Sequence, residues 1–355
     1  MLGWRRFVLA VVGGFGAIIA CLAIFIVLMN PYGNLPKLVF SEHAITDINQ
    51  RFQYPSLIRS GRYDSIVVGA SDARLLRPEF LDDAFDGHFA NLSMNAGLAW
   101  EQYRLVDLYL RQPGTPRMLL MGLDHVWCDE DAAEQRVTFR GFPEWMYDDN
   151  RWNDLGYMLN QQTVEISGRR LAVAAGLKSA RFPDGYEVFT PPENAYDKVK
   201  VRNKLWGKEG PHPIEAVTPP YVPSDAERAS WQFPALPWLD EILTRFPGRV
   251  VLAFMPAHVS AQAVPGSAKA ARAEECKARI AEMAKRHEAA LVDFNINSKI
   301  TSNDDNYWDR LHYREPIADR IVADLAEALT TGKDDPNGDW RVLVPPAPSP
   351  LPSSI

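Results

Sequence analysis

The longest apolar run in the chain lies close to its N-terminus. No charged residue occurs between Phe7 and Met29, and Arg5 and Arg6 precede the run. About 20 apolar residues are enough to cross a bilayer as a helix, and basic residues mark the cytoplasmic end of such a helix. The pattern predicts a cytoplasmic N-terminus over 1–6, a single transmembrane anchor over 7–29 in the inner membrane, and an exported periplasmic remainder.

Two other interpretations of this segment stay open. A cleaved signal peptide has a shorter apolar core that ends in small residues, and Ile18-Ile19-Ala20-Cys21 resembles a lipoprotein cleavage site. The stretch 22–29 remains apolar beyond Cys21, so cleavage there would leave an apolar N-terminal segment on the mature protein. The uncleaved anchor is therefore favoured.

Beyond the anchor, short continuous apolar runs alternate with amphipathic segments. Expected strands cover 65–69, 89–92, 117–122, 249–254 and 290–294, and expected helices cover 79–85, 99–111, 236–246, 268–287 and 317–329. Continuous apolar runs are typical of parallel strands that are buried on both faces. The series predicts an α/β fold, a three-layer α/β/α sandwich with a parallel sheet of about five strands, over 62–333.

Three segments do not follow this alternation. A mixed segment over 30–61 is interpreted as a linker with a short helix at 40–52, and the Pro-rich tail 334–355 is expected to be disordered or extended. The segment 127–230 is predicted to be an insertion that covers the active-site edge of the sheet. Its aromatic residues either pack a loop-rich subdomain or form a platform for sugar rings; they are Trp145, Trp152, Tyr157, Tyr186, Tyr196, Trp206 and Tyr221.

Composition narrows the possible partners. The chain carries a formal net charge of −7, and its basic residues are scattered, so nucleic acid is not an expected partner. Of the three cysteines, Cys21 lies in the apolar run, which leaves at most one disulfide and no metal-type spacing. Cys128 has no evident catalytic partner and is interpreted as a buried small residue. No cofactor or metal is predicted.

The candidate chemistry lies at the two ends of the expected sheet-forming region. Ser71 follows an apolar strand and a glycine in Val68-Gly69-Ala70-Ser71, a pattern that places a hydroxyl on a tight turn. Asp309 stands three residues before His312, close enough to put a carboxylate against the imidazole, as a catalytic histidine requires. Together these residues predict a Ser71–His312–Asp309 triad with an acyl-serine intermediate.

These motifs, in this order on an alternating chain, resemble the SGNH (GDSL-like) hydrolase superfamily. Gly69-Ala70-Ser71 is similar to the block that carries the nucleophile, and Asp309 to His312 matches the final block. The resemblance implies that Gly97, in 91–97, gives a backbone N–H to the oxyanion hole. The third block normally carries an oxyanion-binding Asn, but here the stretch reads Gly122-Leu123-Asp124-His125.

Because an ionised Asp124 cannot donate, the oxyanion donor is left open between several groups. Asn95, Asn91 or His125 could take the role, the backbone N–H groups of 71–72 and Gly97 could suffice, or turnover could be slow. The layout is closest to membrane-anchored SGNH-like proteins of bacterial envelope polymer modification, such as those of polysaccharide O-acetylation and teichoic-acid D-alanylation.

Several other polar residues follow predicted strands and are expected at the same sheet edge. His258 is a candidate substrate contact, and Asp72 is expected to cap a turn. A metal at Asp124 and His125 is disfavoured because no third ligand has suitable spacing.

Two functions remain from the sequence. One is an exported serine esterase or O-acyltransferase that acts on acyl esters of an envelope polysaccharide, with an integral-membrane acyl-transfer or export partner. The other is a non-catalytic SGNH-like module that binds glycan or scaffolds an export complex.

Overall fold

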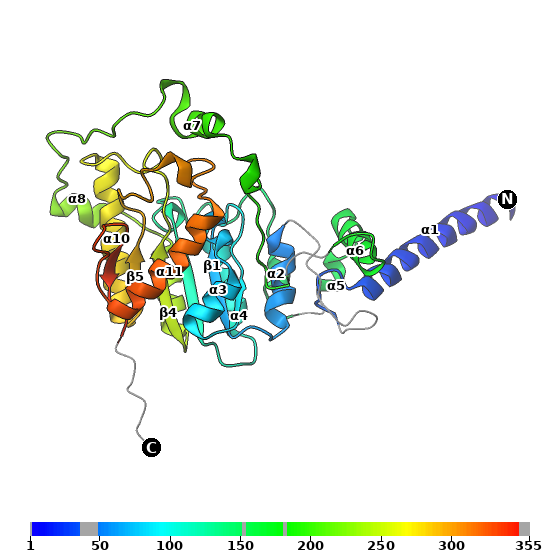
Figure 1. Ribbon diagram of the computed structural model, residues 1–355. Coiled ribbons are helices and arrows are strands. Elements are labelled where there is room, and N and C mark those ends of the chain that lie inside the picture. The colour runs from blue at the N-terminus through cyan, green and yellow to red at the C-terminus, as the bar shows by residue number, and fades with distance from the viewer. Residues whose placement is uncertain (1, 36–48, 151–153, 180–182, 348–355) are drawn as a thin grey trace, which may run out of the picture.

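A six-stranded sheet forms the centre of the computed structural model, which describes residues 2–35, 49–150, 154–179 and 183–347 (Figure 1). The strands are β1 (Ser65–Gly69), β2 (Phe89–Asn91), β3 (Met118–Leu123), β4 (Arg249–Phe254), β5 (Ala290–Asp293) and β6 (Arg341–Val344). Their order is β2-β1-β3-β4-β5-β6; the first five are parallel, and β6 runs antiparallel to β5. The α/β class is confirmed, and the five expected strands are parallel to one another. The sheet as a whole is mixed, because the sixth strand, β6, was not expected and runs antiparallel.

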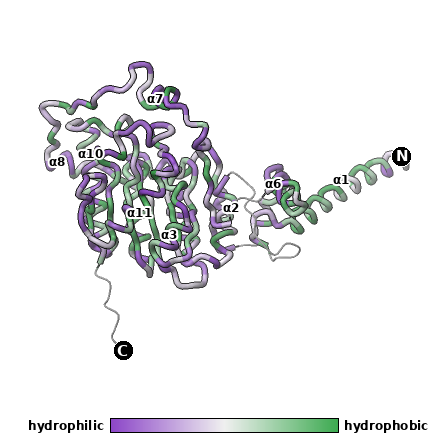
Figure 2. Tube along the Cα trace, in the orientation of Figure 1, coloured by the Kyte–Doolittle hydropathy of each residue, from purple (hydrophilic) through white to green (hydrophobic). Residues whose placement is uncertain are grey.

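Helices pack on both faces of the sheet because the strands bury both of their sides. Ile66 and Val68 of β1 point into one core, and Val67 between them points into the other. The first core is completed by α2 (Gln50–Arg59), α4 (Ala99–Leu110), α9 (Leu236–Arg245) and α10 (Ala268–Arg286), and the second by α3 (Pro78–Phe85) and α11 (Glu315–Thr331). The central strands are accordingly among the most hydrophobic parts of the chain in Figure 2.

The segment expected to be a linker contributes to the core. Residues 36–48 lie outside the described residues, so the helix predicted at 40–52 is described only from its end onward, where α2 begins at Gln50. Within α2, Tyr54, Leu57 and Ile58 are buried in the first core. The linker over 30–61 was therefore wrong in its second half, because its apolar residues are needed to cover the sheet beside α4.

The Pro-rich tail also begins as ordered structure. Residues 341–344 form β6, where Val342 and Val344 pair with β5, and the preceding Trp340 is buried. The expectation of disorder from 334 onward was wrong for this part, since an added strand satisfies the hydrogen-bonding groups at the open edge of β5. Residues 348–355 lie outside the described residues.

The helix α1 (Leu2–Met29) projects away from the sheet and is strongly hydrophobic (Figures 1 and 2). It is the one helix among the described residues that is long and apolar enough to cross a membrane. Two helices of the insertion, α5 (Asp154–Tyr157) and α6 (Gln161–Ala174), lie beside its C-terminal end. Of the other two, α7 (Lys198–Trp206) lies above one end of the strands in Figure 1, and α8 (Asp225–Ser230) lies beside α10, on the side of the sheet away from α1.

The insertion therefore does two different things. Its first half, with α5 and α6, packs at the end of the apolar helix, and its second half passes over the sheet.

Short 3₁₀ turns occur throughout the chain, at Ser71–Leu75, His125–Trp127, Glu144–Met146, Glu193–Ala195, Gly207–Glu209 and Asp304–Asn306.

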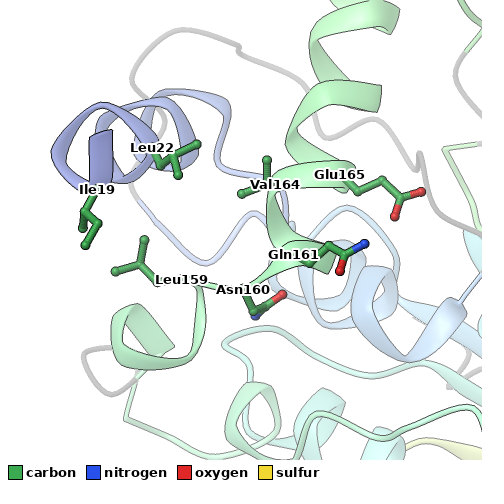
Figure 3. A pocket seen from close by; sticks show the side chains of 7 residues that line it. All are labelled: Ile19, Leu22, Leu159, Asn160, Gln161, Val164 and Glu165. Carbon is green, nitrogen blue, oxygen red and sulfur yellow. The ribbon is translucent and has the colours of Figure 1, made fainter. Parts of the chain in front are cut away.

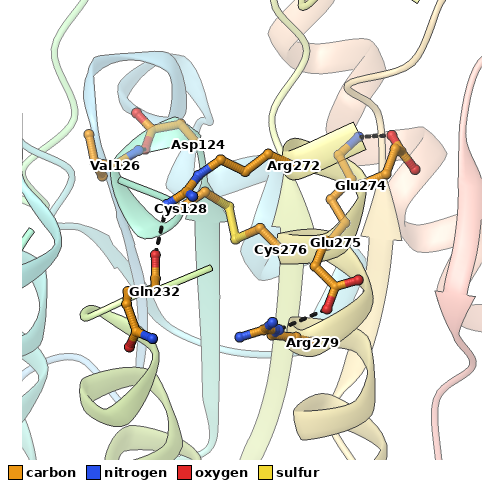
Figure 4. Close-up of a disulfide and its surroundings, with 10 residues drawn as sticks. Asp124, Val126, Cys128, Gln232, Arg272, Glu274, Glu275, Cys276 and Arg279 are labelled. Carbon is orange, nitrogen blue, oxygen red and sulfur yellow. Dashed lines mark hydrogen bonds and ion pairs between the residues drawn. A yellow bond between two sulfur atoms is a disulfide. The ribbon is translucent and has the colours of Figure 1, made fainter. Parts of the chain in front are cut away.

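A disulfide ties the insertion to the body of the fold. Cys128, just after the turn that follows β3, is bonded to Cys276 on α10, and 148 positions separate them in the sequence (Figure 4). Arg272 on the same helix donates to the backbone oxygen of Gln232 at 2.9 Å. Cys21 on α1 is the free cysteine.

Candidate active site

The turn after β1 presents Ser71 because two glycines let it lie directly on the strand ends. Gly69 and Gly122 are partners in the register of β1 and β3. A Cβ on either glycine would lie 2.7 Å from the Cβ of Ala73, closer than any real contact. The 3₁₀ turn that begins at Ser71 can therefore sit against the sheet only with glycine at both positions.

The loop after β5 carries the other two members of the expected triad. An isolated antiparallel bridge between Tyr307 and Tyr313 closes the loop, and Trp308 N–H donates to the His312 carbonyl at 2.8 Å. Asp309 Oδ1 accepts from the backbone N–H of Leu311 at 2.9 Å and of His312 at 3.0 Å. Backbone groups of its own loop thus hold the Asp309 carboxylate in position, independently of its contact with the imidazole.

The structure brings Ser71, His312 and Asp309 together in one line of contacts. Ser71 Oγ lies 2.8 Å from His312 Nε2, and Asp309 Oδ2 lies 2.8 Å from Nδ1 of the same ring. Both distances are those of good hydrogen bonds. With Asp309 accepting from Nδ1–H, Nε2 is the unprotonated nitrogen and can accept the Ser71 proton.

The charge of Asp309 is stabilised at this position. Burial alone would raise its pKa, but the hydrogen bond and charge of His312 and the two backbone N–H groups outweigh burial, so the pKa is lowered. The His312 side chain is 24% exposed, which leaves the ring reachable from solvent. The lowered pKa keeps Asp309 ionised beside the imidazole.

Three further side chains close the site around the imidazole. The hydroxyl of the buried Tyr313 donates to the Asp72 carbonyl, which ties the histidine loop to the serine turn. Phe189, from the insertion, meets the His312 ring edge-on, with centroids 5.3 Å apart. The Arg74 guanidinium stacks over Phe189 at 4.7 Å and pairs with Glu187 at 2.7 Å. Residues 187–189 of the segment 127–230 therefore lie beside the His312 ring.

Asn95 lies beside the serine turn. Met94 N–H donates to the Gly69 carbonyl at 3.0 Å, and Arg74 Nη1 donates to Asn95 Oδ1 at 2.6 Å. The guanidinium occupies the amide oxygen, so the amide nitrogen of Asn95 is turned to the other side. It has no hydrogen-bond acceptor among the described residues.

A buried ion pair supports the Asn95 loop from below. Arg51 and Glu101 are bidentate partners at 2.7 and 2.6 Å, and neither side chain is exposed. The same guanidinium donates to the carbonyls of Asn95 and Ala96. Sequence reasoning missed Arg51 because nothing local links it to Glu101, 50 positions away. Arg74 had a weak signal, since it follows Ser71 by about one turn.

Two carboxyl groups stand at the ends of the neighbouring strands β1 and β3. Burial raises the pKa of Asp124, and burial together with the charge of Asp124 raises the pKa of Asp72. Asp124 Oδ1 accepts from Val126 N–H at 3.1 Å, and Asp72 Oδ1 accepts from Ala73 N–H at 2.9 Å. Asp124 caps the turn at His125–Trp127, whereas Asp72 lies inside the turn at Ser71–Leu75, which has Ala70 at its N-cap and no side-chain cap, so the capping role expected for Asp72 is not observed. Repulsion between the two charges favours keeping a proton on one of them.

Three other candidates do not contact Ser71, His312 or Asp309 through a hydrogen bond among the described residues. Gly97 N–H donates to the Met94 carbonyl at 3.1 Å, so it already serves a turn rather than an oxyanion. The Asn91 amide donates to three carbonyls of the serine turn and its oxygen accepts from Ser93, which makes it a scaffold residue. His125 points to solvent with 75% of its side chain exposed.

His258 is also corrected from substrate contact to scaffold residue. It is fully buried, with Nδ1 2.9 Å from Ser260 Oγ and Nε2 3.2 Å from Asp304 Oδ1. Asp304 also accepts from Trp206 at 2.9 Å. Burial lowers the pKa of His258, so the ring is neutral and joins α7 to the base of the histidine loop.

The aromatic residues of the insertion are mostly packing residues. Trp145 stacks on Tyr157 near α1, Tyr186 is buried, and Tyr196 contacts Trp308 edge-on. Trp152 lies outside the described residues. Phe189, which sequence reasoning did not single out, is the aromatic ring that contacts His312.

No family model matches the chain, and no curated protein matches its sequence. The site must be interpreted from its own geometry.

Proposed function

We propose that the chain is a membrane-anchored, exported serine esterase or O-acyltransferase of the SGNH type, acting on acyl esters of an envelope polysaccharide. One observation carries the proposal: Ser71 Oγ lies 2.8 Å from His312 Nε2, and Asp309 lies 2.8 Å from Nδ1. Three residues with these roles and contacts, drawn from the two ends of the domain, form the arrangement that nucleophilic acyl transfer requires.

The reaction follows from these contacts. Ser71 Oγ attacks the ester carbonyl carbon while His312 Nε2 takes its proton. When the tetrahedral intermediate collapses, the ester bond to the alkoxide breaks and His312 returns the proton to the leaving alcohol. Water or a sugar hydroxyl then attacks the acyl-Ser71 ester, again with His312 as base, which gives a free acid or a new ester.

The developing oxyanion needs a donor, and we assign this role to the Asn95 amide nitrogen. Arg74 donates to the Asn95 amide oxygen, and Asn95 lies beside the serine turn. The Asn95 amide nitrogen has no other acceptor among the described residues. The first N–H groups of the turn at Ser71–Leu75, which have no partner within that turn, complete the hole. Asn95 thus takes the role that Asp124 cannot fill when it is ionised.

Export is supported by the N-terminal helix and by the disulfide. Arg5 and Arg6 before an apolar helix favour a cytoplasmic N-terminus. A Cys128–Cys276 bond is stable in an oxidising compartment and rare in the cytosol. In cells, neither cysteine should react with a thiol-specific mass tag unless reductant is added first. Tagging of both without reductant would place the domain in the cytoplasm.

The second candidate, a non-catalytic glycan-binding or scaffold module, is favoured by one observation. Gly97 N–H is engaged in a turn, and the third-block position holds Asp124, so two oxyanion donors implied by the family resemblance are not supplied. A module of this kind would keep the fold without turnover.

Serine-directed labelling separates the two candidates. A fluorophosphonate probe should modify the wild-type protein and should not modify Ser71→Ala, because labelling requires an activated hydroxyl. Ser71→Ala should lower hydrolysis of an acetyl ester at least about a hundredfold, His312→Ala nearly as much, and the double variant no further, since triad members act as a unit. Full acetyl-ester hydrolysis by Ser71→Ala would remove the catalytic proposal.

Asn95 and Asn91 provide a matched pair for the oxyanion assignment. Asn95→Ala should lower kcat by about a hundredfold or more with little change in KM, as expected for a lost oxyanion donor. Asn91→Ala should instead lower the free energy of unfolding, because three backbone carbonyls lose their donor. Equal kcat for wild type and Asn95→Ala would refute the assignment.

A further inference from the structure

A groove opens between α1 and the start of α6, far from the catalytic residues. It has a volume of about 690 Å³, and Ile19 and Leu22 of α1 form one wall while Leu159 and Val164 form the other (Figure 3). Polar groups, including Glu165, stand along its rim.

The position of the groove along α1 gives its depth. A hydrocarbon core of about 30 Å takes about 20 helical residues at 1.5 Å each, so a span that starts at Phe7 reaches the neighbourhood of Ile26. Ile19 and Leu22 then lie about 6–10 Å inside the hydrocarbon boundary. Both are partly exposed, at 40% and 37%, and continue the outward-facing apolar surface of the helix.

The second wall of the groove cannot move away from this depth independently. Tyr32 Oη lies 2.9 Å from Thr163 Oγ1 at the start of α6. Arg170, further along α6, donates to the Asn30 carbonyl at 3.1 Å. Asn34 donates to Asp154 of α5 at 2.7 Å. These buried contacts fix α5 and α6 to the residues that directly follow α1.

The surface of this region has the composition of a membrane interface. Several of its apolar side chains are exposed, namely Leu155, Tyr157, Leu159, Leu171 and Leu177. Tyr32, Trp145 and Tyr157 form a continuous aromatic cluster, with centroid distances of 5.6 Å for each neighbouring pair. Tyr and Trp are enriched where hydrocarbon meets headgroups. Tyr157 is the exposed member of this cluster, at 55%, whereas Tyr32 is buried, so Tyr157 is the aromatic residue of the cluster that is placed to contact the boundary.

We propose that the groove between α1 and α6 is a lipid site, which takes an acyl chain of a phospholipid from the leaflet next to the main domain. The occupant follows from continuity: one wall is the lipid-facing side of α1, and at that depth the surrounding solvent is hydrocarbon. The 154–177 region is thereby a second membrane contact that lies in the interface beside the anchor. The inference rests on α1 spanning a bilayer and is independent of the triad.

Spin-label accessibility in liposomes tests the proposal with the full chain. Cys21→Ala removes the free thiol, and single cysteines are then introduced as Leu159→Cys in the groove, Ile18→Cys on the lipid side of α1 and Val222→Cys on the distant surface. The last two positions are 60% and 76% exposed. The vesicles contain phosphatidylethanolamine and phosphatidylglycerol, and collision with oxygen is compared with collision with a polar nickel chelate.

The oxygen-to-nickel ratio at 159 should match that at 18 and exceed that at 222 several-fold. Tyr157→Cys gives a second position in the aromatic cluster, where the ratio should lie between those two values. Retention of the Cys128–Cys276 disulfide in each variant shows that the fold is intact. A ratio at 159 equal to that at 222 would overturn the lipid site, and so would exclusion of both reagents, which would assign the groove to protein.

Discussion

The disulfide between Cys128 and Cys276 allows a stability prediction whose size follows from the chain itself. Closing a loop removes about 2.1 + 1.5R ln n cal/mol/K from the entropy of the unfolded chain, where n is the number of residues in the loop. For the 148 positions between the two cysteines, this amounts to about 17 cal/mol/K, or about 5 kcal/mol at 25 °C. Losing the bond should therefore lower the free energy of unfolding by about 2–5 kcal/mol.

The measurement is a guanidinium titration of the full chain in detergent, followed by tryptophan fluorescence. The double variant Cys128→Ala/Cys276→Ala is compared with the wild type, and reduced wild type should unfold at nearly the same midpoint as the variant. Cys21→Ala is the matched control, because Cys21 is exposed on α1 and unpaired. A change below about 1 kcal/mol, or an equal effect of Cys21→Ala, would refute the entropic argument.

Two further stability predictions concern buried charge. Arg51→Met leaves Glu101 ionised and unpaired, which should cost about 3–5 kcal/mol, whereas Arg51→Met/Glu101→Leu should cost less than the single change in the same titration; additive losses would contradict this. Burial and the charge of Asp124 raise the pKa of Asp72 in the folded protein above its value in the unfolded chain. The protonated Asp72 therefore contributes stability that is complete below about pH 4 and is lost as the pH rises through the folded-state pKa. Asp72→Asn should then be more stable than wild type at about pH 7 and no more stable at about pH 4, and the reverse order would refute the sign.

The site illustrates why local patterns found some residues and not others. Asp309 and His312 are three positions apart, so one loop determines their contact. Asn95 was one of several oxyanion donors left open, and its proposed role depends on Arg74, which approaches it from a different element. His258 follows a strand as a substrate contact would, yet Trp206 and Asp304 enclose it.

The amino-acid sequence by itself determined the apolar helix, the alternation of strands and helices, and the choice of Ser71, His312 and Asp309 as candidate site residues. These features depend on periodicity and residue type within short windows, so positions that are close together in the sequence determine them. The tertiary structure alone decided that residues 50–59 and 341–344 belong to the folded domain, that Arg51 pairs with Glu101, and that 154–177 packs beside α1. Each of these features depends on contacts between segments that are far apart in the sequence. The tertiary fold determines which apolar surfaces are buried against each other and which buried charges are paired.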